Sequence, residues 1–173
     1  MIAAPPSRQL LACVDVDYRE REAMSACLLF ERWEDDRAVG TLVARISSVT
    51  EYLPGQFYLR ELPCLLAILR PIAAVLKIVV VDGYVWLENG KEPGLGARLY
   101  EALRGEVAVI GVAKTRFRGA VAIEVRRGQS GRPLYVTAAG VSAEAAARHV
   151  REMRGAHRVP TLLKQVDQLC RRT

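Results

Sequence analysis

Two continuous apolar runs constrain the fold of this chain more than any other feature. They cover residues 77–81 (KIVVV) and 107–113 (VAVIGVA), and β-branched residues dominate both. Such runs favour strands that are covered on both faces, as in a parallel pair. Residues 95–103, between them, have the apolar spacing of a helix. Strand, helix and strand with short connections predict a right-handed crossover that places both strands parallel in one sheet.

The first 50 residues predict a different arrangement. Strand patterns at 10–18, 23–33 and 39–47 follow one another with short polar connections, which favours an antiparallel meander. We therefore expect an α/β fold: a mixed sheet, meander first and parallel strands later, with helices on both faces. Further predicted elements are helices at 57–69, 142–154 and 161–172 and short strands at 121–125 and 134–137. The 57–69 helix has its predicted apolar stripe at Leu59, Leu62, Leu65 and Leu66, and Pro63 predicts a kink or a late start.

Composition sets limits on the class of protein. A chain of 173 residues with 51% hydrophobic residues is large enough for one domain with a real core, so we expect a single domain over 1–173. The net charge of +6 favours a polyanionic partner, although many unrelated proteins share it. Arginines at 116, 118, 126, 127 and 132 suit either phosphate contacts or a solvated face.

Neither the cysteines nor the N-terminus points to secretion. Four isolated cysteines without metal-ligand spacing suit a reduced, cytoplasmic setting. The N-terminus lacks the pattern of a signal peptide. The apolar runs fall far short of the roughly 20 residues that span a bilayer. We expect a cytoplasmic monomer with no membrane partner.

Acidic residues lie within or directly after the predicted apolar strands. Asp15 lies within an otherwise apolar strand, with Asp17 on the same face, although an edge strand with solvated acids would look alike. Asp82 and Gly83 follow the 77–81 run, at the carboxyl end where open α/β sheets bind ligands. A plain Asp-Gly turn is the alternative. Lys114 follows the second run in the matching position, where a solvated loop lysine is the alternative.

Two further acids complete a chemical hypothesis. Glu61 and Asp167 fall in predicted helices, where each alone would pass for a surface acid. Hard cations such as Mg²⁺ prefer a few carboxylates together with water and phosphate oxygens. Two such ions can activate a water and stabilise the leaving oxygen of a phosphodiester, and Lys114 would neutralise developing charge. The residues alone thus predict a metal-dependent α/β phosphotransfer domain.

Six ordered segments of the chain resemble the endonuclease V family. CVDVDY carries the first catalytic Asp at Asp15, YLPGQFYLRE carries the turn and the Glu at Glu61, and VVVDG carries the second Asp at Asp82. IGVAKT corresponds to the strand end with Lys114, PLYVT to a late strand, and RVPTLLKQVD to the last helix with its acid at Asp167. Each motif alone is weak evidence for the resemblance, but six motifs in the order of the family are specific evidence.

The resemblance implies a ribonuclease H-like fold and an endonuclease for DNA or RNA. It implies Mg²⁺, with Mn²⁺ as a substitute, held by Asp15, Glu61, Asp82 and Asp167, with Lys114 at the scissile phosphate. The reaction would be hydrolysis near a deaminated base such as inosine, in repair of damaged DNA. Substrate-binding residues carried over from the family are Tyr52, Leu53, Pro54, Gly55 and Gly83, the first three as a wedge that opens the strands.

The chain also departs from the family pattern. After Asp82 the run reads GYVWLEN, without the family's second Gly, its His or its Pro-Arg, and Gly140 is not followed by His. These differences surround the lesion pocket and bear on inosine specificity more than on metal binding. They leave two alternatives open: a non-catalytic nucleic-acid-binding relative, or a different metal-dependent nuclease on the same fold.

Overall fold

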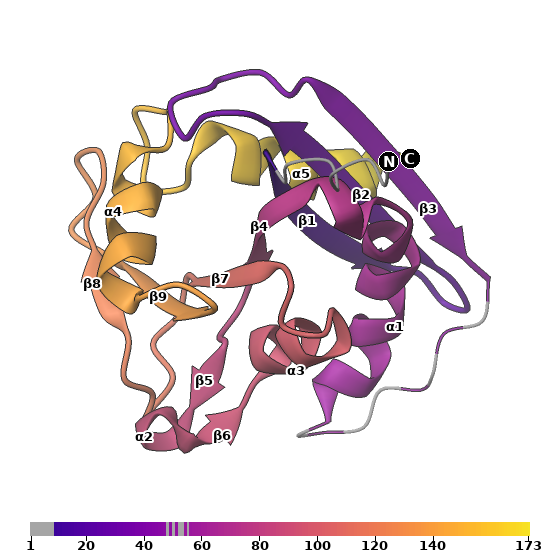
Figure 1. Ribbon diagram of the computed structural model, residues 1–173, viewed down its shortest axis with the longest axis horizontal. Helices are drawn as coiled ribbons and strands as arrows, with labels where there is room; N and C mark the ends of the chain where they lie inside the picture. The colour runs from indigo at the N-terminus through magenta and orange to yellow at the C-terminus, as the bar shows by residue number, and fades with distance from the viewer. Residues whose placement is uncertain (1–8, 48, 50, 52–53, 55) are drawn as a thin grey trace, which may run out of the picture.

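A seven-stranded mixed sheet organises the chain (Figure 1). The computed structural model describes residues 9–47, 49, 51, 54 and 56–173. The strand order is β3-β2-β1-β4-β7-β9-β8, which puts β4 at the centre. The strands are β1 (Leu10–Tyr18), β2 (Ala23–Phe30), β3 (Gly40–Ile46), β4 (Leu76–Asp82), β7 (Ala108–Ala113), β8 (Ile123–Val125) and β9 (Leu134–Ala139).

Both predicted pairing patterns are confirmed. β1, β2 and β3 pair antiparallel, whereas β4 pairs parallel with β1 and with β7. The short predicted strands correspond to β8 and β9, which pair antiparallel, and β9 also runs antiparallel to β7. The sheet is therefore antiparallel at its two sides and parallel in the middle, where helices cover both faces.

Four longer helices accompany the sheet, close to their predicted positions. They are α1 (Phe57–Leu69), α3 (Leu95–Ala102), α4 (Ala143–Glu152) and α5 (Thr161–Arg172). The Ser142 hydroxyl accepts a hydrogen bond from the Ala145 amide, as an N-cap does. The sequence analysis missed four short elements: a 3₁₀ helix (Arg70–Val75), α2 (Glu88–Lys91) and the two-residue strands β5 (Trp86–Leu87) and β6 (Glu92–Pro93).

Alternation along the central strands builds two cores. Leu11, Cys13, Ile78 and Val80 belong to the core that α4 and α5 cover, whereas their neighbours on β1 and β4 belong to the core under α1 and α3. Figure 1 shows α1 and α3 lying apart from α4 and α5 across the strands. By the same alternation, the side chain of Asp15 belongs to the face of α5.

The buried face of helix α1 differs in detail from the face predicted from the sequence. Leu65 and Leu66 are buried as expected, but Leu59 is 40% exposed, so its predicted place in the apolar stripe is wrong. Burial instead continues through Ile68 and Leu69, because the covered stripe lies nearer the C-terminal half of the helix. Pro63 lies inside a helix that is continuous from Phe57 to Leu69. The helix therefore begins six residues before Pro63, and the predicted late start is wrong.

A glycine in β7 lets the chain after β4 fold back over the sheet. A Cβ built on Gly111 would lie 2.5 Å from the Gly83 carbonyl oxygen, so no larger residue fits without a shift. The Val85 amide donates to the Thr137 hydroxyl at 2.8 Å, and the Trp86 indole donates to the Ala138 carbonyl at 3.0 Å. The segment after Asp82 is thus held tightly against β7 and β9.

Arg127 differs from the other arginines of its cluster. It is only 7% exposed, so the prediction of a phosphate-binding or solvated side chain is wrong for this residue. Its guanidinium donates to the carbonyl oxygens of Met153, Gly155, His157 and Arg158. Arg127 therefore anchors the loop between α4 and α5 by donating to its backbone carbonyls, the first of which lies at the C-terminal end of α4, where helix carbonyls are left free.

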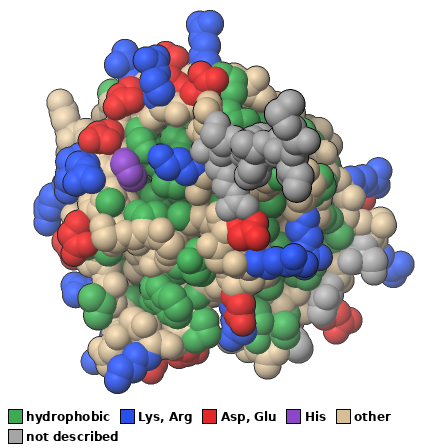
Figure 2. Space-filling model, viewed as in Figure 1, with side chains coloured by type: hydrophobic (Ala, Val, Ile, Leu, Met, Phe, Trp, Pro, Cys, Tyr) green, Lys and Arg blue, Asp and Glu red, His purple; other side chains and the backbone are tan. Residues whose placement is uncertain are grey.

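On the face that Figure 2 shows, Lys and Arg side chains are interspersed with Asp and Glu around the rim, so charges of neither sign dominate this face. Within the described part of the chain, no helix combines the length and the apolar character needed to cross a bilayer.

Replacing Arg127 is expected to cost substantial stability. Arg127→Met keeps the aliphatic stem but leaves the loop carbonyls without donors, so we expect a loss of about 3 kcal/mol in the free energy of unfolding. Urea denaturation measures this loss. The matched control is Arg126→Met at the exposed neighbour, expected within about 0.5 kcal/mol of wild type. Equal stabilities of the two variants would contradict the anchoring role.

Candidate metal centre

The parallel register of β1 and β4 sets two acids side by side. Val14 pairs with Val81, the last pair between these strands, so Asp15 and Asp82, the next residue of each strand, emerge together where the pairing of β1 with β4 ends. Both carboxylates line a small cleft of about 20 Å³. That is room for roughly one water-sized occupant. The sequence prediction that these acids meet at the sheet edge therefore agrees with the geometry.

Lys114 joins the two acids from the third parallel strand. Asp82 pairs with Val112 of β7, and Lys114 lies two residues further along, on the same face. Its Nζ donates to the Asp82 carboxylate at 2.6 Å. Burial tends to lower the pKa of Lys114, but the hydrogen bond to Asp82 and the charges of Asp15 and Asp167 outweigh burial and raise it. Lys114 is therefore a permanent cation of the cleft.

Glu61 approaches the same edge from the other side of the sheet, on α1. It is 6% exposed, and its Oε2 atom has no hydrogen-bond partner among the described residues. Two contacts fix the helix that carries it. The Ser25 hydroxyl of β2 donates to the Cys64 carbonyl at 2.8 Å, and the Arg60 guanidinium lies 4.0 Å from the Tyr18 ring centroid.

The acids perturb one another electrostatically. Burial, with smaller contributions from Asp15 and Asp82, raises the pKa of Glu61 to about 8. Burial also raises the pKa of Asp15 to about 6, where repulsion from Asp82 and Asp167 adds to the effect and a hydrogen bond from the Val16 amide opposes it. Burial, with the smaller mutual repulsion of the acids, thus disfavours full ionisation of these carboxyl groups unless a cation or protons compensate.

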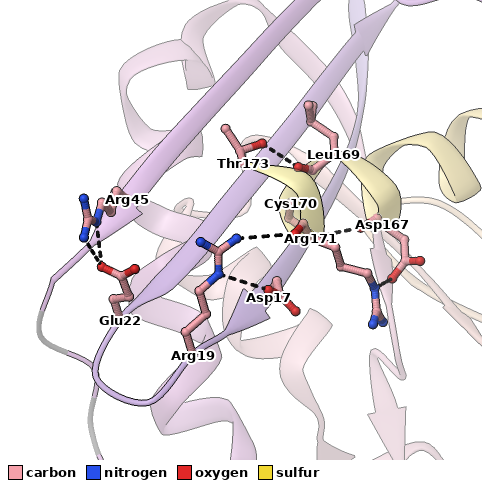
Figure 3. Close-up of polar contacts among 9 residues, drawn as sticks. All are labelled: Asp17, Arg19, Glu22, Arg45, Asp167, Leu169, Cys170, Arg171 and Thr173. Carbon is pink, nitrogen blue, oxygen red and sulfur yellow. Dashed lines mark hydrogen bonds and ion pairs between the residues drawn. The ribbon is translucent and has the colours of Figure 1, made fainter.

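Asp167 lies near the other acids, but its carboxylate is paired with Arg171. α5 packs against β1, and the charge of Asp167 reaches both Asp15 and Lys114. Its carboxylate accepts a hydrogen bond from Arg171 on the same helix at 2.9 Å (Figure 3). Figure 3 also shows Arg19 bridging Asp17 and the Arg171 carbonyl, which ties the end of β1 to α5.

The four acids are gathered, but they do not form a finished coordination shell. In the described ranges, no three Asp, Glu, His or Cys side chains are already placed to ligate one cation. Asp82 faces Lys114 and Asp167 faces Arg171, which accounts for this arrangement. The donor set itself fits a hard divalent cation, because carboxylate oxygens dominate it and the buried Glu61 Oε2 lacks any described partner.

The predicted substrate-binding residues are only partly visible. Tyr52, Leu53 and Gly55 lie outside the described residues, so their predicted wedge role stays a prediction. Pro54 is exposed in a turn before α1. Gly83 has a φ of +130°, and an added Cβ would meet nothing within 4 Å. Gly83 therefore leaves open space directly beside Asp82.

The sequence analysis assigned no role to Arg158. This residue holds the backbone directly after β7, where Lys114 lies. Its guanidinium donates to the backbone carbonyl of Lys114 and to that of Pro133, the latter at 2.7 Å. The backbone of Arg158 is in turn held by Arg127. The RVP segment was noted as part of the family resemblance, but the sequence could not indicate which distant carbonyls its arginine contacts.

Comparison with known proteins decides the family. The family model described as Endonuclease V matches residues 3–130. A protein named Endonuclease V from Streptomyces avermitilis is 31% identical over 97% of this chain and 82% of its own length. The chain belongs to the endonuclease V family. A crystal structure of an endonuclease V from the same species superposes with a TM-score of 0.74 at 25% identity, covering 98% of this chain and 82% of that one.

More distant endonuclease V structures share the fold. The enzyme from Ciona intestinalis, solved in complex with a 24mer DNA containing an inosine followed by a ribo-adenosine, gives a TM-score of 0.77 at 17% identity. The alignment covers 95% of this chain and 85% of that chain. The ribonuclease H-like α/β fold expected from the resemblance is confirmed. The predicted single domain over residues 1–173 stays a prediction.

Glu61 is expected to give the metal-free protein an unusual pH dependence. Its folded-state pKa of about 8 exceeds the ordinary value of 4.5, so folding is favoured while Glu61 is protonated. This contribution is full below pH 4.5 and is lost as the pH rises toward 8. In EDTA at pH 8, Glu61→Gln should therefore be more stable than wild type by about 2 kcal/mol.

Urea denaturation at pH 5 and pH 8 measures this effect. Glu124→Gln, at an exposed acid of β8, is the matched control and should follow wild type at both pH values. A Glu61→Gln variant that is less stable than wild type at pH 8 would show that the carboxylate has a stabilising partner.

Proposed function

We propose that this chain is a divalent-metal-dependent endonuclease that hydrolyses a phosphodiester bond near a deaminated base, such as inosine, in DNA or RNA. We propose a role in nucleic-acid repair in the cytoplasm, with Mg²⁺ as the cofactor and Mn²⁺ as a substitute. The observation that carries the proposal is the convergence of Asp15, Asp82 and Glu61 at one sheet edge, beside Lys114.

The chemistry of the donors supports this reaction class. Asp15, Asp82 and Glu61 would hold the cation, with Asp167 as a further acid at the edge. A divalent cation, when bound, supplies Lewis-acid stabilisation and lowers the pKa of a bound water. Endonucleases that cut phosphodiesters need such charge neutralisation, and a cluster of mutually repelling carboxylates at a sheet edge is suited to provide the ligands.

The residues of the chain have separable roles in this proposal. The Asp15 and Asp82 carboxylates are fixed by strand pairing and orient what binds between them. Lys114 would donate to a non-bridging oxygen of the scissile phosphate, because its ammonium already lies in the cleft. Arg158 positions Lys114 by holding its carbonyl. The Ciona intestinalis relative was crystallised with inosine-containing DNA, which supports a deaminated base as the recognised feature.

A non-catalytic nucleic-acid-binding relative is the second candidate. It is favoured by the ion pair between Lys114 and Asp82, which neutralises one of the proposed ligands. Binding of inosine-containing nucleic acid without cutting, in either Mg²⁺ or Mn²⁺, would support it over the endonuclease.

Loss of either Asp15 or Asp82 is expected to lower the rate of cleavage strongly. With inosine-containing DNA or RNA in Mg²⁺, Asp15→Asn and Asp82→Asn should each lower the cleavage rate by roughly 100-fold or more. Asp17→Asn is the matched control, because Asp17 lies two residues from Asp15 and pairs with Arg19. Gel analysis of end-labelled substrates measures the rates. Cleavage that survives both substitutions would refute this site.

Binding of the cation itself is expected to stabilise the fold. At pH 8, saturating Mn²⁺ should raise the Tm of wild type and of Asp17→Asn by about 5 °C. The Asp15→Asn/Asp82→Asn double variant should show no such rise. Thermal unfolding with and without EDTA measures the shift. An equal rise in the double variant would place the metal elsewhere.

A further inference from the structure

A buried tyrosine hydroxyl beside the candidate metal centre has no role in the reaction proposed above. Tyr18 is the last residue of β1. Its Oη atom is buried and has no hydrogen-bond partner in the described part of the chain. Most buried polar side-chain atoms make a hydrogen bond, because burial without one is unfavourable. The hydroxyl of Tyr18 is therefore an exception that needs an explanation.

Tyr18 lies on the side of the sheet from which Glu61 approaches. Val14 and Val16, two and four residues earlier on β1, belong to the core under α1, so strand alternation turns Tyr18 toward this helix. The Tyr18 ring meets the Phe57 ring edge-on, with the centroids 6.3 Å apart. Phe57 and Glu61 are four residues apart on α1 and therefore share one face of it. The phenol thus lies alongside the helix face that carries Glu61.

The ring of Tyr18 is held from a second direction by Arg60. The guanidinium carbon of Arg60 lies 4.0 Å from the ring centroid, a cation–π contact. The contacts with Phe57 and Arg60 restrict the ring, whereas the hydroxyl hydrogen can still rotate toward an acceptor. Tyr18 is therefore a donor at a fixed place with an adjustable direction.

Glu61 supplies the complementary acceptor. Burial, and after it the charge of Glu61, raises the pKa of Tyr18 well above its ordinary value, so the phenol keeps its proton and remains a donor. The Oε2 atom of Glu61 is also buried without a partner in the described ranges. An ionised carboxylate accepts hydrogen bonds only. The two unpartnered groups are therefore neighbours of opposite hydrogen-bonding type.

The other three acids of the centre already have a donor each. The Val16 amide donates to Asp15 at 2.9 Å, Lys114 donates to Asp82 at 2.6 Å, and Arg171 donates to Asp167 at 2.9 Å. Such hydrogen bonds orient carboxylates that ligate a metal, and loss of one commonly weakens metal affinity by roughly 10–100-fold. Glu61 is the acid whose orientation still requires a donor.

We propose that Tyr18 is a positioning residue for Glu61: in the cation-bound protein its hydroxyl donates to Oε2 and so directs the carboxylate at the cation. The inference deepens the proposed function and rests on it, because Glu61 needs this orientation only if it holds a cation. The competing interpretation is that the ring of Tyr18 alone matters, as packing for Phe57 and Arg60, and that its hydroxyl is incidental.

Mn²⁺ binding tests the positioning role independently of cleavage. Tyr18→Phe removes the hydroxyl and keeps the ring contacts. Isothermal titration with Mn²⁺ should show roughly tenfold weaker binding by this variant than by wild type. Tyr100→Phe is the matched control, because the Tyr100 ring lies near Gly105, before the start of β7 and far along that strand from Lys114. It should bind Mn²⁺ as wild type does.

Two further measurements distinguish positioning from packing. In EDTA the hydroxyl has no partner, so Tyr18→Phe should be at least as stable as wild type in urea denaturation. Addition of Mn²⁺ to wild type should shift tyrosine absorbance to longer wavelength, because one phenol O–H then donates to a carboxylate. Tyr18→Phe should lack this shift, and Tyr100→Phe should retain it.

The outcomes separate this inference from the proposed function. Equal Mn²⁺ affinity of Tyr18→Phe and wild type would overturn the positioning role and leave the metal centre intact, as would an undiminished absorbance shift in Tyr18→Phe. A variant that is less stable than wild type in EDTA, or that fails to fold, would show that the hydroxyl is structural and would also overturn it. Wild type that binds no Mn²⁺ would refute the proposed metal centre itself, and the inference with it.

Discussion

The in-register parallel pairing of β1 with β4 is the constraint on which the candidate site depends. It brings two carboxylates together just past the last β1–β4 pair, although like charges this close repel each other. The arrangement persists because Lys114 arrives from the next strand and offsets part of the repulsion. Site and sheet are therefore inseparable: the same hydrogen bonds that order the core also set the spacing of the acids.

Arginine donors to backbone carbonyls hold the surroundings of the site. Arg127 fixes the loop before α5, and Arg158 of that loop reaches the strand end with Lys114. On the other side of the sheet, Arg60 and Arg98 lie against the tyrosines Tyr18 and Tyr58. These four arginines contribute to the positive net charge, but their heads are directed at the protein. The charge total alone therefore overstates how much of the surface is free for a polyanion.

Much of the fold could be predicted because the arrangement of apolar residues in the sequence is distinctive where the structure has regular strands and helices. The KIVVV strand follows from its continuous β-branched run, and the meander and the helix at 57–69 follow from their periodicity. Asp15 and Asp82 could be singled out because each is a charge within or directly after an apolar strand. Leu59 and Arg127 were misjudged because burial of one side chain depends on tertiary packing, which local spacing does not determine.

The two ends of the sheet differ in how far they invite another strand. β8 is three residues long, so that edge exposes few free backbone groups. β3 is seven residues long, and Val43 on it is 39% exposed. Arg45, paired with Glu22, is the charged residue that blunts this edge. β3 is thus the longer of the two outer strands, and a charged side chain such as Arg45 on an outer strand disfavours pairing with a further strand.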